Sequence, residues 1–181
     1  MKRVAAPVRE EARASGGGQG WRGRVWRYGP LVAWVGLIFF ASTGNLSGEN
    51  TSLVIRPLLL WLFPDITEPE LLRAHLLIRK VAHFTEYAVL ALLAARAFLT
   101  SSRPRLQRRW AAAALLLVVA CALLDEYHQS FVPTRGSSVY DSLIDTAGGA
   151  SALAFVSLWR SRRSRRGGRE RGRRRPQRDV L

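Results

Sequence analysis

Side chains that can move protons or hold charge gather at three places in an otherwise largely apolar sequence. The ordinary pKa of an imidazole lies near neutrality, so a histidine beside carboxylates can act as an acid or a base. Lysine and arginine can bind an anion such as a phosphate. The three groups are Lys80, His83, Glu86 and Tyr87, then Asp125, Glu126, His128 and Gln129, and then Arg135, Ser138, Asp141 and Asp145.

These residue types predict two kinds of site. In a catalytic site, His83 would be the acid or base, and Asp125, Glu126 and Asp141 would be the candidate carboxylates. In a binding site, the other members would hold a polar ligand, and these are Lys80, Tyr87, Gln129, Arg135, Ser138 and Asp145. No serine stands in a recognisable nucleophile motif, so the residues leave the choice between catalysis and binding open.

Metal and cofactor chemistry have weaker support in the sequence. His83 or His128 could ligate a metal together with Asp125 and Asp141, but their spacing matches no known ligand pattern. Cys121 is the single cysteine, which excludes a disulfide framework and a cysteine-based metal site. No phosphate-binding loop or zinc-protease motif is present. We therefore expect no metal and no cofactor.

The charge of the chain is concentrated at its two ends. The net charge is +15 over 181 residues, and residues 1–29 carry +5 while residues 160–181 carry +9. The residues between them are nearly neutral and contain long apolar runs. This distribution excludes an evenly basic nucleic-acid-binding domain and predicts a membrane protein with basic ends. We expect the bilayer, and not a nucleic acid, to be its main partner.

Four segments are apolar enough to be membrane-spanning helices. A bilayer core of roughly 30 Å needs about 20 helical residues, or fewer where polar ends reach the interface. We expect the first segment to be a retained helix that starts at Pro30, not a signal peptide. The predicted fold class is an all-α integral membrane four-helix bundle. Its spans are about 28–43, 80–99, 110–127 and 140–159.

The segments outside the spans differ in character. Residues 1–27 and 160–181 are predicted to be basic, disordered cytoplasmic tails around a transmembrane domain of residues 28–159. The 43–79 loop is predicted to be partly helical. Within it, residues 53–63 are too short to span and contain Pro57, which favours an interfacial or re-entrant segment. A short helix is expected over residues 68–80, with Thr67 as its N-cap and Glu70 completing a capping box.

Loop charge predicts the orientation. The two tails and the 100–109 loop are rich in arginine, whereas the 43–79 and 128–139 loops are not. Basic loops remain on the cytoplasmic side, so both termini are expected in the cytoplasm. The basic tails would then contact anionic lipid.

This topology brings the three polar groups to one depth. The second span begins outside, the third ends outside and the fourth begins outside, so all three groups lie near the outer face. On the fourth span, Asp141, Asp145, Gly148 and Ala152 form one stripe, and the two small residues allow a neighbouring helix to approach. Charges at this depth are expected to turn inward and pair.

The cluster has several possible uses. It could be an outer-face enzyme site that acts on a lipid-linked envelope precursor. It could bind such a precursor or a lipophilic drug without turning it over, or serve a small oligomeric transporter. It could also be a structural clasp, because polar contacts between helices contribute only about 0.6 kcal/mol each.

Two runs of residues resemble the VanZ-like family, whose members are small bacterial membrane proteins named after a teicoplanin-resistance protein. The first run is Lys80-x-x-His83-Phe84-x-x-Tyr87-x-x-Leu90. The second, more specific run is Asp125-Glu126-x-x-Gln129-x-Phe131-x-Pro133-x-Arg135-x-x-Ser138-x-x-Asp141-x-x-x-Asp145-x-x-Gly148. The resemblance covers about residues 30–159.

The resemblance implies an envelope-related membrane role, with low-level lipoglycopeptide resistance in some members. It supplies no reaction. Two positions depart from the family pattern: Asp145 stands where asparagine is often expected, and Thr134 stands where glycine commonly precedes the arginine. The first departure adds an acid to the predicted pocket.

Overall fold

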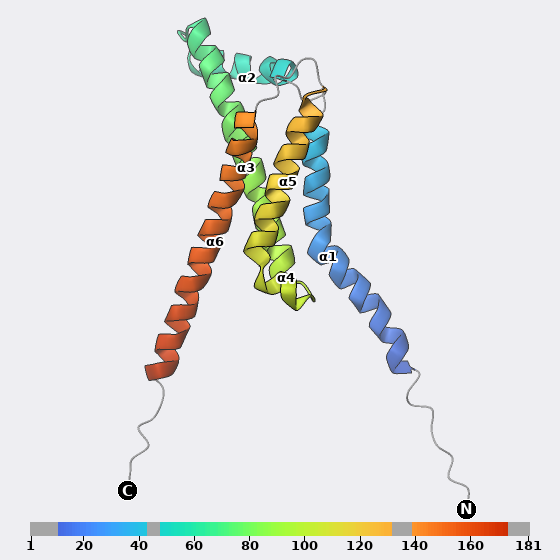
Figure 1. Cartoon of the computed structure of the whole chain (residues 1–181). Helices are drawn as coiled ribbons and strands as arrows, with labels where there is room; N and C mark the ends of the chain where they lie inside the picture. Colours follow the sequence, from blue (N-terminus) through green and yellow to red (C-terminus); the bar gives the residue numbers. More distant parts are fainter. Residues whose placement is uncertain (1–10, 43–47, 132–138, 174–181) are drawn as a thin grey trace, which may run out of the picture.

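The computed structural model describes residues 11–42, 48–131 and 139–173, and these residues form six α-helices and no strand (Figure 1). The helices are α1 (Glu11–Ala41), α2 (Gly48–Leu62), α3 (Glu68–Leu99), α4 (Pro104–Arg108), α5 (Trp110–Gln129) and α6 (Val139–Arg173). The predicted all-α class is confirmed.

The long helices α1, α3, α5 and α6 pack together, and the short helices lie at opposite ends (Figure 1). Helix α2 lies across the end where α3 and α6 begin and α5 finishes. Helix α4 lies at the other end, toward which the first residues of α1 and the last residues of α6 also extend. The three helices that carry the predicted polar groups therefore bring those groups to the same end of the bundle.

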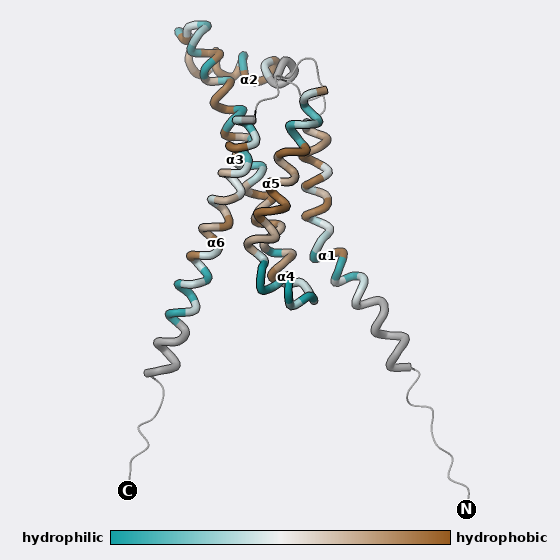
Figure 2. Tube along the Cα trace, viewed as in Figure 1, coloured by the Kyte–Doolittle hydropathy of each residue, from teal (hydrophilic) through white to brown (hydrophobic). Residues whose placement is uncertain are grey.

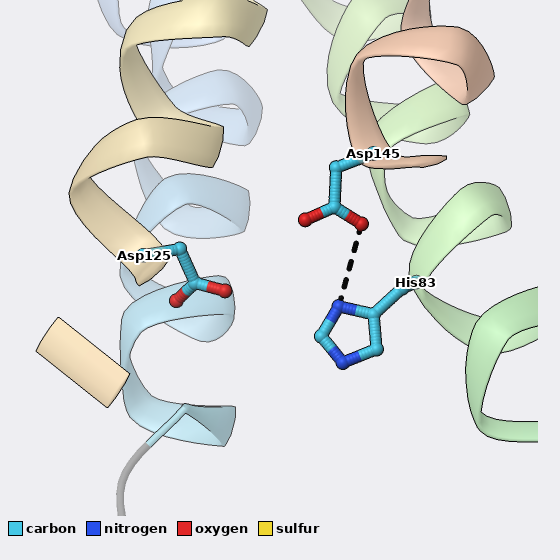
Figure 3. A group of neighbouring side chains, drawn as sticks. All are labelled: His83, Asp125 and Asp145. Atoms are coloured by element: carbon cyan, nitrogen blue, oxygen red, sulfur yellow. Dashed lines mark ion pairs between the residues drawn. The ribbon is translucent and has the colours of Figure 1, made fainter. Parts of the chain in front are cut away.

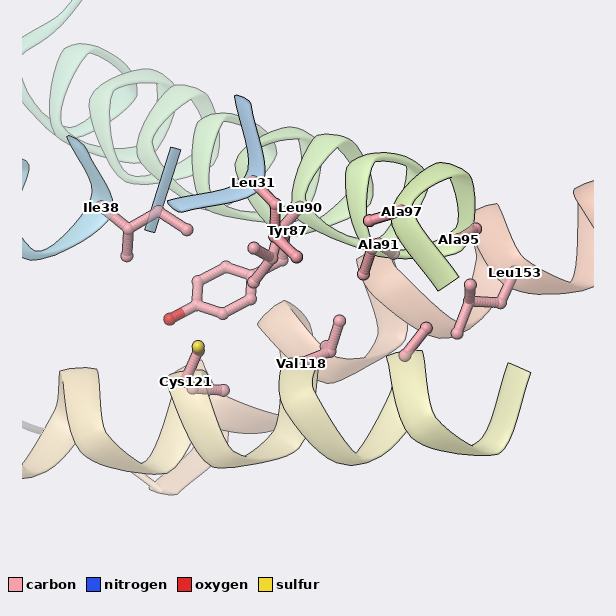
Figure 4. Close-up of a cluster of buried hydrophobic side chains, with 13 residues drawn as sticks. Leu31, Ile38, Tyr87, Leu90, Ala91, Ala95, Ala97, Val118, Cys121 and Leu153 are labelled. Carbon is pink, nitrogen blue, oxygen red and sulfur yellow. The ribbon is translucent and has the colours of Figure 1, made fainter. Parts of the chain in front are cut away.

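Small side chains form most of the buried core, so the helices can approach closely (Figure 4). Larger core residues come from α1, α3 and α6, including Ile38, Tyr87 and Leu153. Alanine adds little side-chain volume, and close contact between helix backbones follows from that. The small members from α3 and α5 are Ala91, Ala94, Ala95, Ala97, Ala114, Val118, Cys121 and Ala122.

Two adjacent glycines place α6 between α3 and α5. A Cβ added at Gly148 would overlap the backbone carbonyl of Phe84 on α3 and lie 2.9 Å from its carbon. A Cβ at Gly149 would lie 2.6 Å from a methyl group of Val118 on α5. The close approach expected from Gly148 is therefore present, and Ala152, one turn further, packs against the core.

Pro30 lies inside α1, and the prediction that it starts the helix is wrong. A proline has no N–H, so the carbonyl of Trp26, four residues earlier, loses its helical donor. The guanidinium of Arg96 on α3 donates to that carbonyl at 3.3 Å. This contact from another helix compensates for the missing bond and allows α1 to continue through the proline.

The basic tails are also more ordered than predicted. Helix α1 already begins at Glu11, and α6 continues to Arg173, so residues 11–27 and 160–173 are helical. Arginine, alanine and glutamate are good helix formers, and each helix continues from an apolar segment that is already folded. In α2, the helix continues through Pro57, so this proline does not interrupt it.

The helix start predicted before residue 68 is confirmed. Thr67 is the N-cap of α3, and its backbone N–H and hydroxyl donate to the Glu70 carboxylate at 2.9 and 2.7 Å. These bonds hold the pKa of Glu70 below its usual value. The expected 68–80 helix and the second predicted span form one continuous helix, because no proline or glycine separates them.

Among the described residues, two segments are long and apolar enough to cross a membrane, namely Trp110–Gln129 and Tyr140–Arg166. Hydrophobic residues occupy the middle of the bundle, and hydrophilic residues surround α4 (Figure 2). Many apolar side chains also face outward, as Leu116 on α5 and Phe155 on α6 show with exposures of 71% and 69%. Outward apolar surface of this kind is typical of helices in contact with lipid.

Candidate functional site

A cavity of about 360 Å³ lies between α3 and α6 at the α2 end of the bundle. Its walls combine cationic and acidic side chains with two aliphatic ones. A cavity of this size is large enough for a small polar group, and ligand sites are commonly apolar with a few placed charges. The lining residues are Leu76, Arg79, Lys80, His83, Asp141, Ile144 and Asp145.

An ion pair joins the two helices at the cavity. The Lys80 ammonium lies 3.4 Å from a carboxylate oxygen of Asp141. Both side chains retain contact with solvent, with 50% and 24% of their surfaces exposed. An exposed pair of this kind contributes less than about 1 kcal/mol to stability. Lys80 therefore remains accessible to an anion that enters the cavity.

A second, more buried group lies beside this pair. His83 Nδ1 is 3.5 Å from Asp145 Oδ1, and Asp125 faces both of them from α5 (Figure 3). One ligand-type atom from each of the three residues lies within 4.8 Å of the other two. His83 and Asp145 also line the cavity, so the buried group borders the space that a ligand would occupy.

Polar atoms of this group lack hydrogen-bond partners within the described residues. Gln129 donates to Asp125 Oδ2 at 2.7 Å, but Asp125 Oδ1 has no partner. The hydroxyl of the fully buried Tyr87, which points toward Cys121, has none either (Figure 4). Asp145 Oδ1 has only the His83 ring nitrogen, at 3.5 Å. Buried polar atoms normally have partners, and leaving one unsatisfied costs about 1–3 kcal/mol.

The packing around the glycines explains why these side chains meet. Phe84 approaches Gly148 through its backbone, and His83 precedes Phe84 in α3. Asp145 lies three residues before Gly148 on α6, so it shares roughly the same helix face. The close contact between the two helices at Gly148 therefore brings the carboxylate of Asp145 to the imidazole of His83.

Most of the predicted site residues lie at this end of the bundle. Lys80, His83, Asp141 and Asp145 line the cavity. Behind them lie the buried Tyr87, Asp125 and Gln129. Glu126 is half-buried next to Asp125 but belongs to neither the cavity nor the three-residue group, and His128 is exposed. Arg135 and Ser138 lie outside the described residues. The functional roles of all these residues stay predictions.

The sequence reasoning missed part of the cavity wall. Leu76 and Arg79 on α3 and Ile144 on α6 line it but carry no motif of their own. A signal was available, because Leu76, Arg79 and His83 are separated by three and four residues and so share one helix face. The side chains that could together hold a metal ion are His83, Asp125 and Asp145, whereas the sequence offered Asp141 in place of Asp145.

The described residues thus form a small helical protein with two segments long and apolar enough to cross a membrane and a polar cavity at one end. A family profile described as VanZ/LLP1 matches residues 28–160, and the chain belongs to this family. This finding confirms the resemblance seen in the sequence. Comparisons with curated proteins and with solved structures gave no match.

Proposed function

We propose that this VanZ-like protein crosses a bacterial plasma membrane four times and binds the charged headgroup of a lipid-linked envelope precursor at its outer side. Glycopeptide or lipoglycopeptide resistance would follow from that binding. The cavity between α3 and α6 is the observation that carries the proposal. It combines the cations Arg79 and Lys80 with aliphatic walls, as an amphiphilic ligand requires.

Two features support four spans with both termini in the cytoplasm. The apolar core takes residues from all four long helices, so α1 and α3 lie at the same depth as α5 and α6. In addition, α4 and its flanks are basic, and basic loops remain on the cytoplasmic side. The α2 end, with the cavity, would then face outward. The basic residues at the α4 end are Arg103, Arg105, Arg108 and Arg109.

The topology can be tested with reporters that are active on one side of the membrane only. Fusions at residues 105 and 175 should report the cytoplasm, and fusions at residues 55 and 135 should report the outside. A C-terminus on the outside would contradict the proposed orientation and would place the cavity on the cytoplasmic side.

The basic end of α6 is proposed to contact anionic lipid of the inner leaflet. The guanidinium of Arg163 lies 5.2 Å from the ring centre of Trp159, and both side chains are exposed. An aromatic ring with a basic residue beside it is typical of a membrane interface. Each basic residue near an anionic surface contributes about 1 kcal/mol, so the tail would add to anchoring.

Binding of a precursor can be measured directly. The full chain in lipid nanodiscs would be titrated with a polyprenyl phosphate, and Lys80→Ala should weaken binding by roughly tenfold because it removes a charge-assisted contact. Lys80→Arg should retain binding. Arg73→Ala is the matched control, since Arg73 is an exposed cation on α3 that does not line the cavity. Equal affinity for Lys80→Ala and Arg73→Ala would contradict the proposal.

The role in cells needs a separate measurement. Glycopeptide susceptibility and the precursor pool would be compared by growth assay and mass spectrometry in cells with the wild-type gene, with Lys80→Ala or with Arg73→Ala. We expect Lys80→Ala to lose the resistance at normal membrane abundance. Loss of resistance in both variants would indicate a general defect and not a specific pocket.

A second candidate function is acid–base catalysis on the same ligand. The contact of 3.5 Å between His83 and Asp145 favours it, because a carboxylate beside an imidazole orients the ring and stabilises its protonated form. Here His83→Gln should abolish conversion of the precursor while affinity changes little. His75→Gln is the control, since His75 is a half-buried histidine on the same helix outside the cavity. An unchanged precursor in the presence of the wild-type chain would exclude this candidate.

A further inference from the structure

The three-residue group contains the ion pair of His83 with Asp145 and a further buried carboxylate, that of Asp125. It joins three helices, α3, α5 and α6, at the point where all of them pack. Asp125 and Asp145 are each only 1% exposed. Among the described residues, Asp125 Oδ1 has no hydrogen-bond partner, and Asp145 Oδ1 has only the His83 ring nitrogen, at 3.5 Å. Two buried carboxylates that share one imidazole favour a further cation between them.

Among the described residues, no lysine or arginine forms an ion pair with Asp125 or Asp145. Lys80 pairs with Asp141 at the cavity, and Asp141 is not a member of the three-residue group. His83 supplies at most one positive charge to two acids. A divalent ion would balance both carboxylates, and neutral His83 would then donate a nitrogen lone pair to it.

The distances suit a metal of the zinc type. Zinc bonds to nitrogen and oxygen are about 2.0–2.2 Å long, so two ligand atoms on a tetrahedron lie about 3.4 Å apart. His83 Nδ1 and Asp145 Oδ1 lie 3.5 Å apart, and the whole group lies within 4.8 Å (Figure 3). A movement of up to about 1.4 Å of the Asp125 carboxylate toward the other two would complete three bonds.

Neighbouring residues orient the three side chains, as the residues around a metal site usually orient its ligands. Gln129 donates to Oδ2 of Asp125, and Oδ1 has no hydrogen-bond partner in the described residues. Hydrogen bonds of this kind orient ligands and strengthen metal binding. The contact at Gly148 sets the distance between Asp145 and His83, as described above. Three protein ligands also leave one position open, and two of the ligands border the cavity.

We propose that His83, Asp125 and Asp145 form a site for one divalent transition-metal ion, of which Zn²⁺ is the test case. The open position faces the cavity, where an anionic group or water would complete the coordination. The site does not require the proposed lipid ligand, because all three protein ligands come from the helices themselves. It depends on Asp145, where related chains are expected often to carry asparagine, so the site is a property of this chain.

Zinc binding would be measured on the full chain in nanodiscs, purified with a histidine-free affinity tag and stripped with a chelator. We expect one Zn²⁺ per wild-type chain by elemental analysis and by titration. Asp125→Asn and Asp145→Asn should each weaken binding by more than about 100-fold, and Gln129→Ala by about tenfold. His75→Gln and Asp65→Asn should bind as the wild type does, since both residues lie outside the group.

Two readouts on the wild-type chain keep the test independent of how the variants fold. Zn²⁺ should raise the midpoint of thermal unfolding and a chelator should lower it. Co²⁺ in place of Zn²⁺ should give the visible absorption of a low-symmetry nitrogen and oxygen site, and Zn²⁺ should displace it. The proposal is overturned if the wild-type chain takes up no more metal than the Asp125→Asn variant, or if neither readout responds. Polyprenyl phosphate binding with no metal uptake would leave the lipid proposal standing and exclude this one.

Discussion

The two ends of the helix bundle differ in how their polar groups are paired. At the α4 end, the half-buried Tyr28 hydroxyl donates to Ser101 at 3.0 Å, and the Arg27 guanidinium donates to the exposed Ser102 at 2.9 Å. At the α2 end, the buried Tyr87 hydroxyl and Asp125 Oδ1 have no hydrogen-bond partner in the described residues, and Asp145 Oδ1 has only His83, at 3.5 Å.

This difference separates a structural contact from a candidate site. Polar groups that only tie helices together gain stability by pairing, and the α4 end does this. Polar groups that lie buried and unpaired reduce stability, so they are retained where a ligand completes them. Simple pairing between helices therefore describes the polar groups at the α4 end. It describes the polar cluster at the α2 end less well.

The largest effect is expected from Gly148→Ala, which would push α3 and α6 apart at the α2 end. The new Cβ would overlap backbone atoms of Phe84, which cannot rotate away as a side chain can. We expect a loss of about 3 kcal/mol in the free energy of unfolding. Gly36→Ala is the control, because nothing lies within 4 Å of its Cβ position. Denaturant unfolding in detergent would compare them, and equal stability would disprove the tight contact.

The contrast between the two ends can be tested with two tyrosines. Tyr28→Phe should lower the free energy of unfolding by about 1 kcal/mol, because it removes the bond to Ser101. Tyr87→Phe in the metal-free chain should leave it unchanged or raise it by about 1 kcal/mol, because that hydroxyl has no partner. A similar loss in both variants would mean that the α2 end is paired after all.

The contact between Arg96 and the carbonyl of Trp26 should give a smaller effect. Arg96→Ala is expected to cost about 0.5–1 kcal/mol, because it leaves that carbonyl without a donor. In a Pro30→Ala background the cost should fall, since the new N–H at position 30 can donate to the same carbonyl. A double-mutant cycle measures the coupling, and purely additive effects would contradict the assigned role of Arg96.

The smallest effect is expected at the start of α3. Glu70→Ala should speed hydrogen exchange of the first-turn amides of α3 and leave α5 unchanged, because it removes only the cap bonds to Thr67.

The pKa of Glu70 is lowered in the folded chain, so the contribution of the cap is fully present above the ordinary glutamate pKa of 4.5. It is lost only as the pH falls through the lowered folded value. Exchange protection of these amides should therefore be constant from about pH 5 to 8, after correction for intrinsic rates, and a change in that window would contradict the assignment.

Local signals in the sequence were enough for much of the fold. The uncharged run that became α5, the Thr67 cap and the small residue Gly148 each depend on near neighbours in the chain, and each is present as predicted. The prediction that the three polar groups lie at one end followed from loop charge and from the span ends at which these residues stand. The reach of α1 and α6 into the basic tails was not predicted, because composition alone favoured disorder there.

The sequence by itself determined that polar side chains from three helices would gather at one end of the bundle. Only the tertiary structure decided which of these side chains form ion pairs with one another. Helical spacing places Asp141 and Asp145 on one stripe and leaves either one free to face His83. The contact of Gly148 with Phe84 sets the height of α6 against α3, and at that height Asp145 reaches His83 while Asp141 reaches Lys80. In the same way, the donor that replaces the missing N–H of Pro30 comes from another helix. Such choices depend on distances between helices, which the spacing of residues along one helix does not contain.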